Sequence, residues 1–267
     1  MTATPAVTPE RAVAACIRAA EAHATAGADW TDAVQHTVRS LIDRLATART
    51  LSAPRLPRPT VSAAEAVLDE LGPLSGWHVD DLGEVHQRLL ELTPVTKSDG
   101  TVHASRPNQG RRDKQGAWYT PPEVSAAMAR LALSQQIDRL AADDDPGAIF
   151  DLAVIDPACG AGVMLVEAAR FIAERLAARV SGQDPPSDVH VRAALPAVMT
   201  ECLYGVDIDP VAVDLARAAL WLEAGGREPF GFMDRNIVVG NALDDDMPPA
   251  YRDRYRGNPG RSLRPVA

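Results

Sequence analysis

Apolar residues recur along the chain at two different spacings, which predict alternating helices and strands. Between residues 9 and 50 they recur every three or four positions, the spacing of one helix face. A face of small residues comes first and a face of larger ones follows: Ala12, Ala15, Cys16, Ala19 and Ala20, then Trp30, Val34, Val38, Leu41, Ile42 and Leu45. We therefore expect two helices, the first opened by Thr8-Pro9-Glu10, because proline suits the first helical turn.

A proline-rich stretch near 51–60, LSAPRLPRPT, predicts a linker after these helices. Ser62 and Glu65 have the spacing of a capping box, which predicts that a short helix starts there. Farther on, Leu82, Val85, Leu89 and Leu92 share one face of another helix. His86 lies in this helix with no second metal ligand nearby, so we interpret it as a packing or surface residue.

Residues 94–116 are polar and show no periodicity. They contain Arg106, Arg111, Arg112 and Lys114, so a solvated loop and a surface for nucleic-acid phosphates both remain open. Thr120-Pro121-Pro122 then predicts a helix start, with the threonine as cap. The apolar positions of that helix are Val124, Met128, Leu131 and Leu133.

The second half of the chain alternates short apolar runs with helical patterns. The segments 152–155, 202–210 and 236–243 each contain a predicted strand, and amphipathic helices follow the first two. This βαβαβ order predicts an α/β fold with a parallel sheet, preceded by an α-helical N-terminal region. We place the boundaries at 1–115 for the helical region, 116–246 for the α/β region and 247–267 for a disordered, arginine-rich tail.

Polar residues stand where each predicted strand ends: Asp156, Asp207 and Asn241. Ligands of parallel sheets bind outside the carboxyl ends of the strands, so these three side chains predict a binding site. Gly160 and Gly162 permit a tight turn and a close backbone approach, although such a turn also occurs without any ligand. A carboxylate at the first strand end favours a cationic ligand group over a pyrophosphate.

The amino-acid composition limits the classes of protein to which the chain can belong. Hydrophobic residues make up 46% of the 267 residues, which is enough for a core, and the net charge of −9 argues against tight DNA binding by this chain alone. The three cysteines, Cys16, Cys159 and Cys202, lie far apart, which predicts no metal site and no disulfide framework and suits a reducing cytoplasm. We find neither a signal peptide nor an apolar run of the roughly 18 residues that a membrane helix needs.

Five segments together resemble the adenine-specific DNA methyltransferases of the large restriction-modification and phage-defence type. In chain order they are LGEVHQRLLEL, GAWYTPPEV, DPACGAGVMLVEA, LYGVDIDPVAVDLARAALWLE and NIVVGNAL, which together span about residues 80–243. The resemblance implies a Rossmann-like, S-adenosylmethionine-dependent domain of which 116–246 is the cofactor-binding half. It implies methyl transfer to the exocyclic amine of adenine in DNA.

The resemblance also implies a role for individual residues. Tyr119, Thr120 and Pro121 would flank the methionine end of the cofactor, and Asp156 would face its ammonium group. The backbone of the loop would approach the cofactor closely at Ala158, Cys159, Gly160 and Gly162. At the other end, Asp207 would hold the ribose hydroxyls, Ile208 would pack on the adenine, and Asn241 would accept from the adenine amine. Cys159 is then a small loop residue and not a nucleophile.

The family's D/N-P-P-aromatic catalytic motif has no counterpart in the chain. The nearest segment, Gly257-Asn258-Pro259-Gly260, lacks the second proline, the aromatic residue and a preceding apolar strand. We therefore expect no catalytic residue from Asn258 or Pro259, and we expect a truncated chain that is inactive alone. Without a fourth strand, the strand at 152–155 would have an exposed apolar edge.

Three functions remain open from the sequence. The first is the cofactor-binding part of an adenine-specific DNA methyltransferase, reaching DNA through the complete enzyme. The second is a non-catalytic S-adenosylmethionine-binding module, or a subunit of a split restriction-modification enzyme that a C-terminal polypeptide complements. The third is a methyltransferase acting on RNA or protein. No segment predicts which DNA sequence would be recognised.

Overall fold

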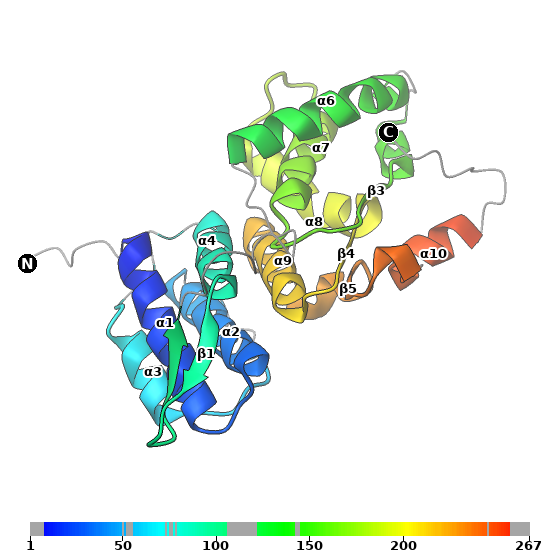
Figure 1. Ribbon diagram of the computed structural model, residues 1–267. Coiled ribbons are helices and arrows are strands. Elements are labelled where there is room, and N and C mark those ends of the chain that lie inside the picture. The colour runs from blue at the N-terminus through cyan, green and yellow to red at the C-terminus, as the bar shows by residue number, and fades with distance from the viewer. Residues whose placement is uncertain are drawn as a thin grey trace, which may run out of the picture. The chain divides into compact units, whose positions relative to one another are not determined.

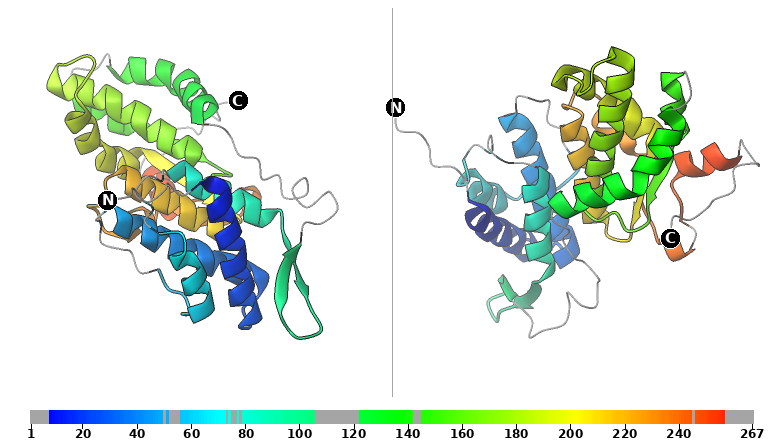
Figure 2. Two further views of the ribbon diagram at one scale, coloured as in Figure 1. Left: turned by 90° about the vertical axis from the view of Figure 1, so that its left-hand side faces the viewer. Right: turned by 90° about the horizontal axis from the view of Figure 1, so that it is seen from above.

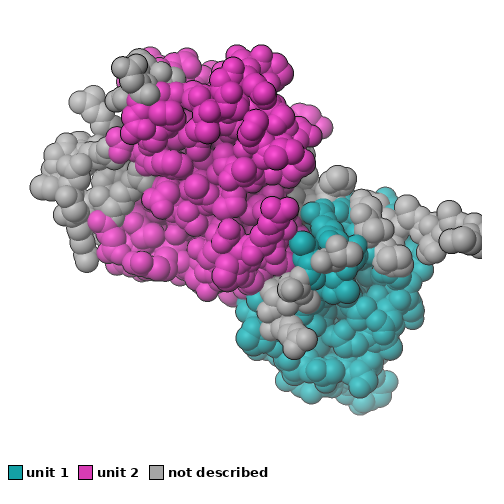
Figure 3. All heavy atoms as spheres, turned by 180° about the vertical axis from the view of Figure 1, so that it is seen from behind, with its two compact units in different colours: residues 1–119 teal, residues 120–267 magenta. Residues whose placement is uncertain are grey.

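The computed structural model describes residues 8–49, 51, 56–72, 74, 77, 79–105, 122–141, 145–244 and 246–256. The chain divides into two compact units, Met1–Tyr119 and Thr120–Ala267, which Figure 3 colours separately. Each unit has a core of its own, so each is described by itself.

Unit 1 contains four helices among its described residues: α1 (Pro9–Thr25), α2 (Trp30–Ala48), α3 (Ser62–Asp69) and α4 (Val79–Leu90) (Figure 1). The two helices predicted between residues 9 and 50 are confirmed. Thr8 caps α1 by accepting from the Arg11 N–H, with Pro9 in the first turn, and Asp29 caps α2. The small-residue face of α1 is fully buried, which lets α2 and α3 pack closely against it.

The predicted capping box at the start of α3 is wrong. The N-cap residue is Val61, and no side chain caps this helix. The Glu65 carboxylate instead accepts from the Ser40 hydroxyl at 2.6 Å and from the Arg44 guanidinium at 2.7 Å, both on α2. A charge-assisted bond to a neighbouring helix therefore replaces the local cap. Of the predicted linker, residues 56–60 have no regular structure and 52–55 lie outside the described residues.

An antiparallel hairpin occupies part of the segment that we expected to be without regular structure. Its strands are β1 (Thr93–Thr96) and β2 (Val102–Ser105), and it runs beside α1 (Figure 2). Asp99-Gly100 forms the turn, with Gly100 at φ +83°, and this dipeptide is a signal that the sequence did contain. Two α1 side chains hold the hairpin, because Thr25 accepts from the Val102 N–H and Glu21 accepts from the Ala104 N–H.

Unit 2 is built on a three-stranded parallel sheet. Its strands are β3 (Val154–Asp156), β4 (Leu203–Asp207) and β5 (Ile237–Val239), in that spatial order. Helix α7 (Val163–Ser181) follows β3, and α9 (Pro210–Glu223) follows β4. An extra helix, α8 (Asp188–Cys202), fills the long interval between the first two strands and packs against α7. The predicted α/β arrangement with a parallel sheet is thus confirmed.

The two faces of β4 pack against different helices. A Cβ atom at Gly205 would lie 3.0 Å from Leu165 of α7, so this face carries no side chain where the helix comes close. The preceding residue, Tyr204, packs edge to face against the Tyr251 ring of α10 (Pro249–Arg256), with the two ring centroids 5.2 Å apart. Successive side chains of a strand point to opposite faces, so α7 and α10 cover opposite sides of β4.

Helix α10 corrects the prediction of a disordered tail beginning at 247. Residues 249–256 are helical, and Tyr251 is buried against the sheet. The prediction failed because burial of the Tyr251 ring anchors a helix that has no apolar periodicity. Residues 257–267 lie outside the described part of the chain.

Helix α6 (Pro122–Ala141) forms as predicted but buries a different face. Its buried positions include Ala129, Leu133 and Ile137, and it packs against α7. Val124, Met128 and Leu131 are exposed, the last by 87%. The described residues of unit 2 also include three short 3-10 helices: η1 (Pro146–Asp151), η2 (Phe230–Met233) and η3 (Ala242–Asp244).

A pair of histidines lies inside unit 1. His23 on α1 is only 1% exposed, and its ring centroid is 5.3 Å from that of His36 on α2. Neither nitrogen of His23, nor Nδ1 of His36, has a hydrogen-bond partner in the described part of the chain. Burial lowers the pKa of both imidazoles, and the proximity of His36 lowers the pKa of His23 further.

Unit 1 should lose stability in mild acid. With both pKa values lowered in the folded state, the stabilisation is complete above the ordinary histidine pKa of about 6.5 and is lost as the pH falls through the lowered values. Hydrogen exchange of peptides from α1 and α2, corrected for the intrinsic rates, would report this on the full chain. The double variant His23→Leu/His36→Leu should lose the acid response, whereas His190→Gln, on the exposed start of α8, should keep it. An unchanged response in the double variant would contradict the assignment.

Candidate functional site

The carboxyl ends of β3, β4 and β5 carry the polar residues expected there. Asp156 is the last residue of β3, Asp207 is the last of β4, and Asn241 follows β5 by two positions. The sheet register brings them to one edge, because Asp156 pairs with Gly205 and Asp207 pairs with Val239. A bond from the Gly240 N–H to the Asp207 carbonyl, at 2.9 Å, continues this alignment beyond β5.

The loop after β3 is tied to the end of β4. The Cys159 N–H donates to the Val206 carbonyl at 2.9 Å, and the Gly160 N–H donates to Oδ2 of Asp207 at 2.8 Å. The other oxygen of Asp207 accepts from the Asp209 N–H at 2.9 Å. Both oxygens of the Asp207 carboxylate thus already accept hydrogen bonds from backbone N–H groups. Each oxygen keeps a second lone pair that can accept from a ligand.

The two glycines of this loop serve different purposes. Gly162 has φ +84°, and a Cβ atom there would lie 2.9 Å from Cα of Ala216 on α9, so its lack of a side chain serves helix packing. Gly160 has φ +52°, and a Cβ atom there would meet nothing within 4 Å. The side of the loop at Gly160 is therefore open, which leaves room for a ligand against the backbone.

The surroundings of the Asp156 carboxyl disfavour its ionised form. Burial raises the pKa of this carboxyl above its ordinary value, and the nearby Asp207 adds to the effect. One N–H, from Ala158 at 3.1 Å, opposes the shift. A cationic group bound beside these two acids would favour the charged form of Asp156, so the electrostatics suit a positively charged ligand.

Exposed apolar side chains border the far end of the same edge. Ile208 follows β4 directly and is 70% exposed, and Val239 at the end of β5 is 51% exposed. Leu243, in η3, is 95% exposed. Large apolar side chains exposed next to strand-end acids provide a surface on which a flat ring can pack.

Cys159 lies inside the loop packing and not at its surface. Its Sγ would be 3.1 Å from a Cβ atom at Gly205, and the residue is 6% exposed. Burial raises the pKa of its thiol well above the ordinary value, with the charges of Asp156 and Asp207 adding to the shift. A buried neutral thiol is a poor nucleophile, which agrees with a structural role.

Asn241 is surrounded by acids that the sequence reasoning did not single out. Its Nδ2 donates to Oδ2 of Asp244 at 2.7 Å, and its backbone N–H donates to Oδ2 of Asp246 at 3.1 Å. The acidic run after Asn241 was the available signal. The remaining predicted site residues, Tyr119, Thr120, Pro121, Asn258 and Pro259, lie outside the described residues.

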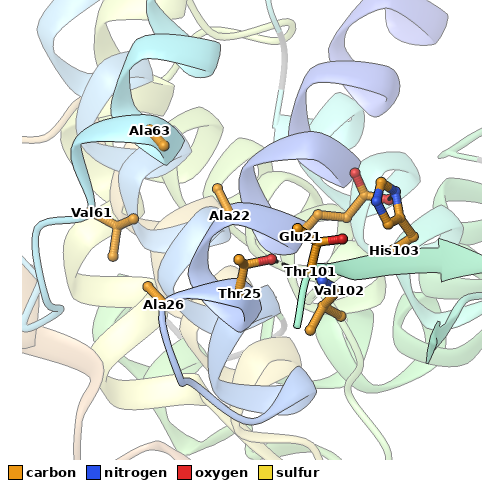
Figure 4. A pocket seen from close by; sticks show the side chains of 9 residues that line it. All are labelled: Glu21, Ala22, Thr25, Ala26, Val61, Ala63, Thr101, Val102 and His103. Carbon is orange, nitrogen blue, oxygen red and sulfur yellow. Dashed lines mark hydrogen bonds and ion pairs between the residues drawn. The ribbon is translucent and has the colours of Figure 1, made fainter. Parts of the chain in front are cut away.

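A hollow of about 400 Å³ lies elsewhere, in unit 1, between the end of α1, the start of α3 and β2 (Figure 4). Alanine, valine and threonine line most of it. Two of its polar side chains, Thr25 and Glu21, already hold the hairpin backbone. Since its main hydrogen-bonding groups are engaged, this hollow is a weaker candidate than the strand-end site.

Within the described ranges, no group of three or more His, Cys, Asp or Glu side chains could hold a metal ion. None of the described helices is long and apolar enough to cross a membrane.

Part of the chain matches the model of a known protein family. Residues 106–251 match the family model described as N-6 DNA Methylase, which is more than half of the chain. The matched segment contains all three strands of the parallel sheet and the loop after β3. A search of curated proteins found no match.

The two loop glycines should respond differently to alanine. Gly162→Ala combines a left-handed backbone with a contact to the α9 backbone, so we expect it to lower the free energy of unfolding by about 2–4 kcal/mol. Gly160→Ala shares the left-handed conformation without the contact and should cost about 1–2 kcal/mol. Urea denaturation of the full chain, followed by circular dichroism, measures both variants. Equal losses would show that α9 does not constrain position 162.

Proposed function

Since the chain belongs to the N-6 DNA methylase family, we propose that unit 2 binds S-adenosylmethionine for methylation of the exocyclic amine of adenine in DNA. The observation that carries the proposal is the meeting of Asp156, Asp207 and Asn241 at one sheet edge, beside a loop that is open at Gly160. The residues fit such a ligand from end to end, with acids at one end and apolar side chains at the other. When bound, the cofactor supplies the methyl group.

Each residue has a defined task in this proposal. Asp156 faces the ammonium group, where its carboxylate and that of Asp207 form an acidic environment suited to a cation. The backbone from Ala158 to Gly162 gives the close approach, and Gly162 also sets the distance between the loop and α9. Tyr119, Thr120 and Pro121 flank the methionine end.

The nucleoside end lies across β4 and β5 in this arrangement. Asp207 accepts from the ribose hydroxyls through the second lone pairs of its two oxygens. Ile208 packs against the adenine ring, which explains why an isoleucine is so exposed at a strand end. Asn241 accepts from the adenine amine. Ordering of the cofactor by these contacts fixes the position of the methyl group without any covalent protein intermediate.

Methyl transfer needs groups that this chain does not supply. The target adenine has to leave the duplex, and the family's D/N-P-P-aromatic motif accepts from its amine and stacks on its ring. Asn258 and Pro259 are not proposed for that role. We propose that the 267 residues bind the cofactor but do not methylate DNA alone, and that a complementing polypeptide completes the site and contacts DNA.

The second candidate is a non-catalytic cofactor-binding module or a subunit of a split restriction-modification enzyme. The edge of the sheet favours it. Within the described ranges β3 pairs only with β4, and Val154 and Ile155 are half-buried there. A parallel sheet is normally covered on both faces and extended by further strands, so this edge suits an added strand. The three cysteines are all buried and form no disulfide, which we take to indicate a cytoplasmic protein.

Calorimetric titration with S-adenosylmethionine tests the binding proposal. Asp156→Asn keeps an acceptor for the Ala158 N–H but removes the charge, so we expect a loss of about 1.5–3 kcal/mol in binding free energy. Because the pKa of Asp156 is raised, wild-type affinity should be complete above that pKa and fall as the pH drops through it, and the variant should lack this dependence. Asp188→Asn, an exposed change of the same type in α8, should bind as the wild type does. A folded wild-type chain that does not bind would refute the proposal.

Transfer of a radioactive methyl group to duplex DNA distinguishes the two candidates. The purified chain should transfer nothing, because the groups that hold a flipped adenine are absent. Addition of a polypeptide that carries the D/N-P-P-aromatic strand should restore transfer if the chain is half of a split enzyme. No transfer with such a polypeptide, despite cofactor binding, would favour the non-catalytic module. Methylation by the single chain would contradict the need for a complement.

A further inference from the structure

The turn after β5 is folded tightly around Asn241. The Asn241 carbonyl accepts from the N–H groups of Asp244 and Asp246, at 2.9 and 3.3 Å. In return, Oδ2 of Asp246 accepts from the Asn241 N–H at 3.1 Å. A Cβ atom at Gly240 would lie 2.7 Å from Cβ of Asp246, so the turn closes only because position 240 is a glycine.

The side-chain amide of Asn241 is fixed at both ends by this turn. Its Oδ1 accepts from the Leu243 N–H at 3.1 Å, and its Nδ2 donates to Oδ2 of Asp244 at 2.7 Å. An amide that flipped would place its NH₂ group against the Leu243 N–H and its oxygen against a carboxylate. Both contacts would then be repulsive, so the turn selects one orientation of the amide.

We propose that Asp244 is a positioning residue that holds the Asn241 amide with Oδ1 available to the adenine amine of the cofactor. The inference rests on the proposed function of this site. The Asp244 carboxylate accepts only, so it has to face Nδ2. That contact leaves Oδ1, with its second lone pair, as the group offered to a donor. Gly240, tied to the Asp207 carbonyl, keeps this acceptor in register with the ribose end.

The same geometry explains why an amide suits position 241 better than a carboxylate. A carboxylate at 241 would bring a negatively charged oxygen about as close to Asp244 as Nδ2 is now, with Asp246 on the other side of the turn. Like charges at such a distance disfavour each other strongly. Asn241 avoids this repulsion and keeps the acceptor, while Asp244 holds the amide in the useful orientation.

Discrimination between adenine and hypoxanthine tests the positioning role. Hypoxanthine has a carbonyl oxygen where adenine has the amine, so a fixed Oδ1 favours S-adenosylhomocysteine over S-inosylhomocysteine, and a free amide accepts either. We expect Asp244→Ala to reduce the ratio of the two affinities roughly three- to tenfold. Asp244→Asn should keep most of the ratio, because its own carbonyl can accept from Nδ2. Asp246→Ala serves as the matched control. It removes the carboxylate that accepts from the Asn241 backbone N–H but leaves the contact of the side-chain amide, so the ratio should be kept.

The outcomes separate this inference from the function on which it rests. A wild type that binds neither compound overturns both proposals. A wild type that prefers S-adenosylhomocysteine, together with an unchanged ratio in Asp244→Ala, overturns only the positioning role. An equal fall of the ratio in Asp246→Ala also overturns it, because the effect would then belong to the turn as a whole.

A pair of substitutions that exchanges the amide and the carboxylate gives an independent measurement if Asp244→Ala does not fold. Asn241→Asp should weaken binding of S-adenosylhomocysteine about tenfold, through repulsion by Asp244. Adding Asp244→Asn should restore affinity to within about threefold, because the new amide can donate to the new carboxylate. Failure of the second change to restore binding would contradict a direct interaction between positions 241 and 244.

Discussion

The two hydrogen bonds to the Asp207 carboxylate hold the candidate site together. One comes from the Gly160 N–H in the loop after β3 and the other from the Asp209 N–H at the start of α9. A single side chain thereby connects the ends of two strands and the beginning of a helix. Bonds from backbone N–H groups to a carboxylate are stronger than those to a neutral acceptor, so this residue orders the loop before any ligand arrives. It combines a structural task with the binding task that we propose for it.

A second constraint is the closeness of the loop to α9. Gly162 leaves no space for even a methyl group, because a Cβ atom there would lie only 2.9 Å from Cα of Ala216. The small residues Gly205 and Ala216 have related functions, since each allows a helix or a loop to lie directly on its neighbour. The strand-end acids can converge because these contacts are short. Stability and site geometry therefore depend on the same few small residues, and a larger side chain at any of them would affect both.

The sequence contained most of the information about unit 2 and less about unit 1. Around Asp156 the spacing of apolar residues changes from that of a strand to that of a helix, and glycines mark the turn between them. Such local signals predicted the sheet and the grouping of Asp156, Asp207 and Asn241. The buried face of α6 could not be predicted, because both of its faces carry apolar residues and only tertiary packing chooses between them. The capping box predicted at Glu65 was wrong because the partners of this carboxylate, Ser40 and Arg44, are distant in sequence. The Asp99-Gly100 turn was present but overlooked within a polar segment.

The insertion of α8 affects how the sheet can form. Val154 pairs with Leu203 across the whole of α7 and α8, whereas β4 and β5 are separated mainly by the single helix α9. Strands that are distant in sequence can pair only after a long loop has closed, which costs conformational entropy. Such pairing therefore forms more slowly than local pairing. We therefore expect the α7–α8 hairpin and the β4–α9–β5 unit to form from local contacts, and β3 to join them last. In that order, the loop that carries Gly160 and Gly162 would become ordered only when folding is complete.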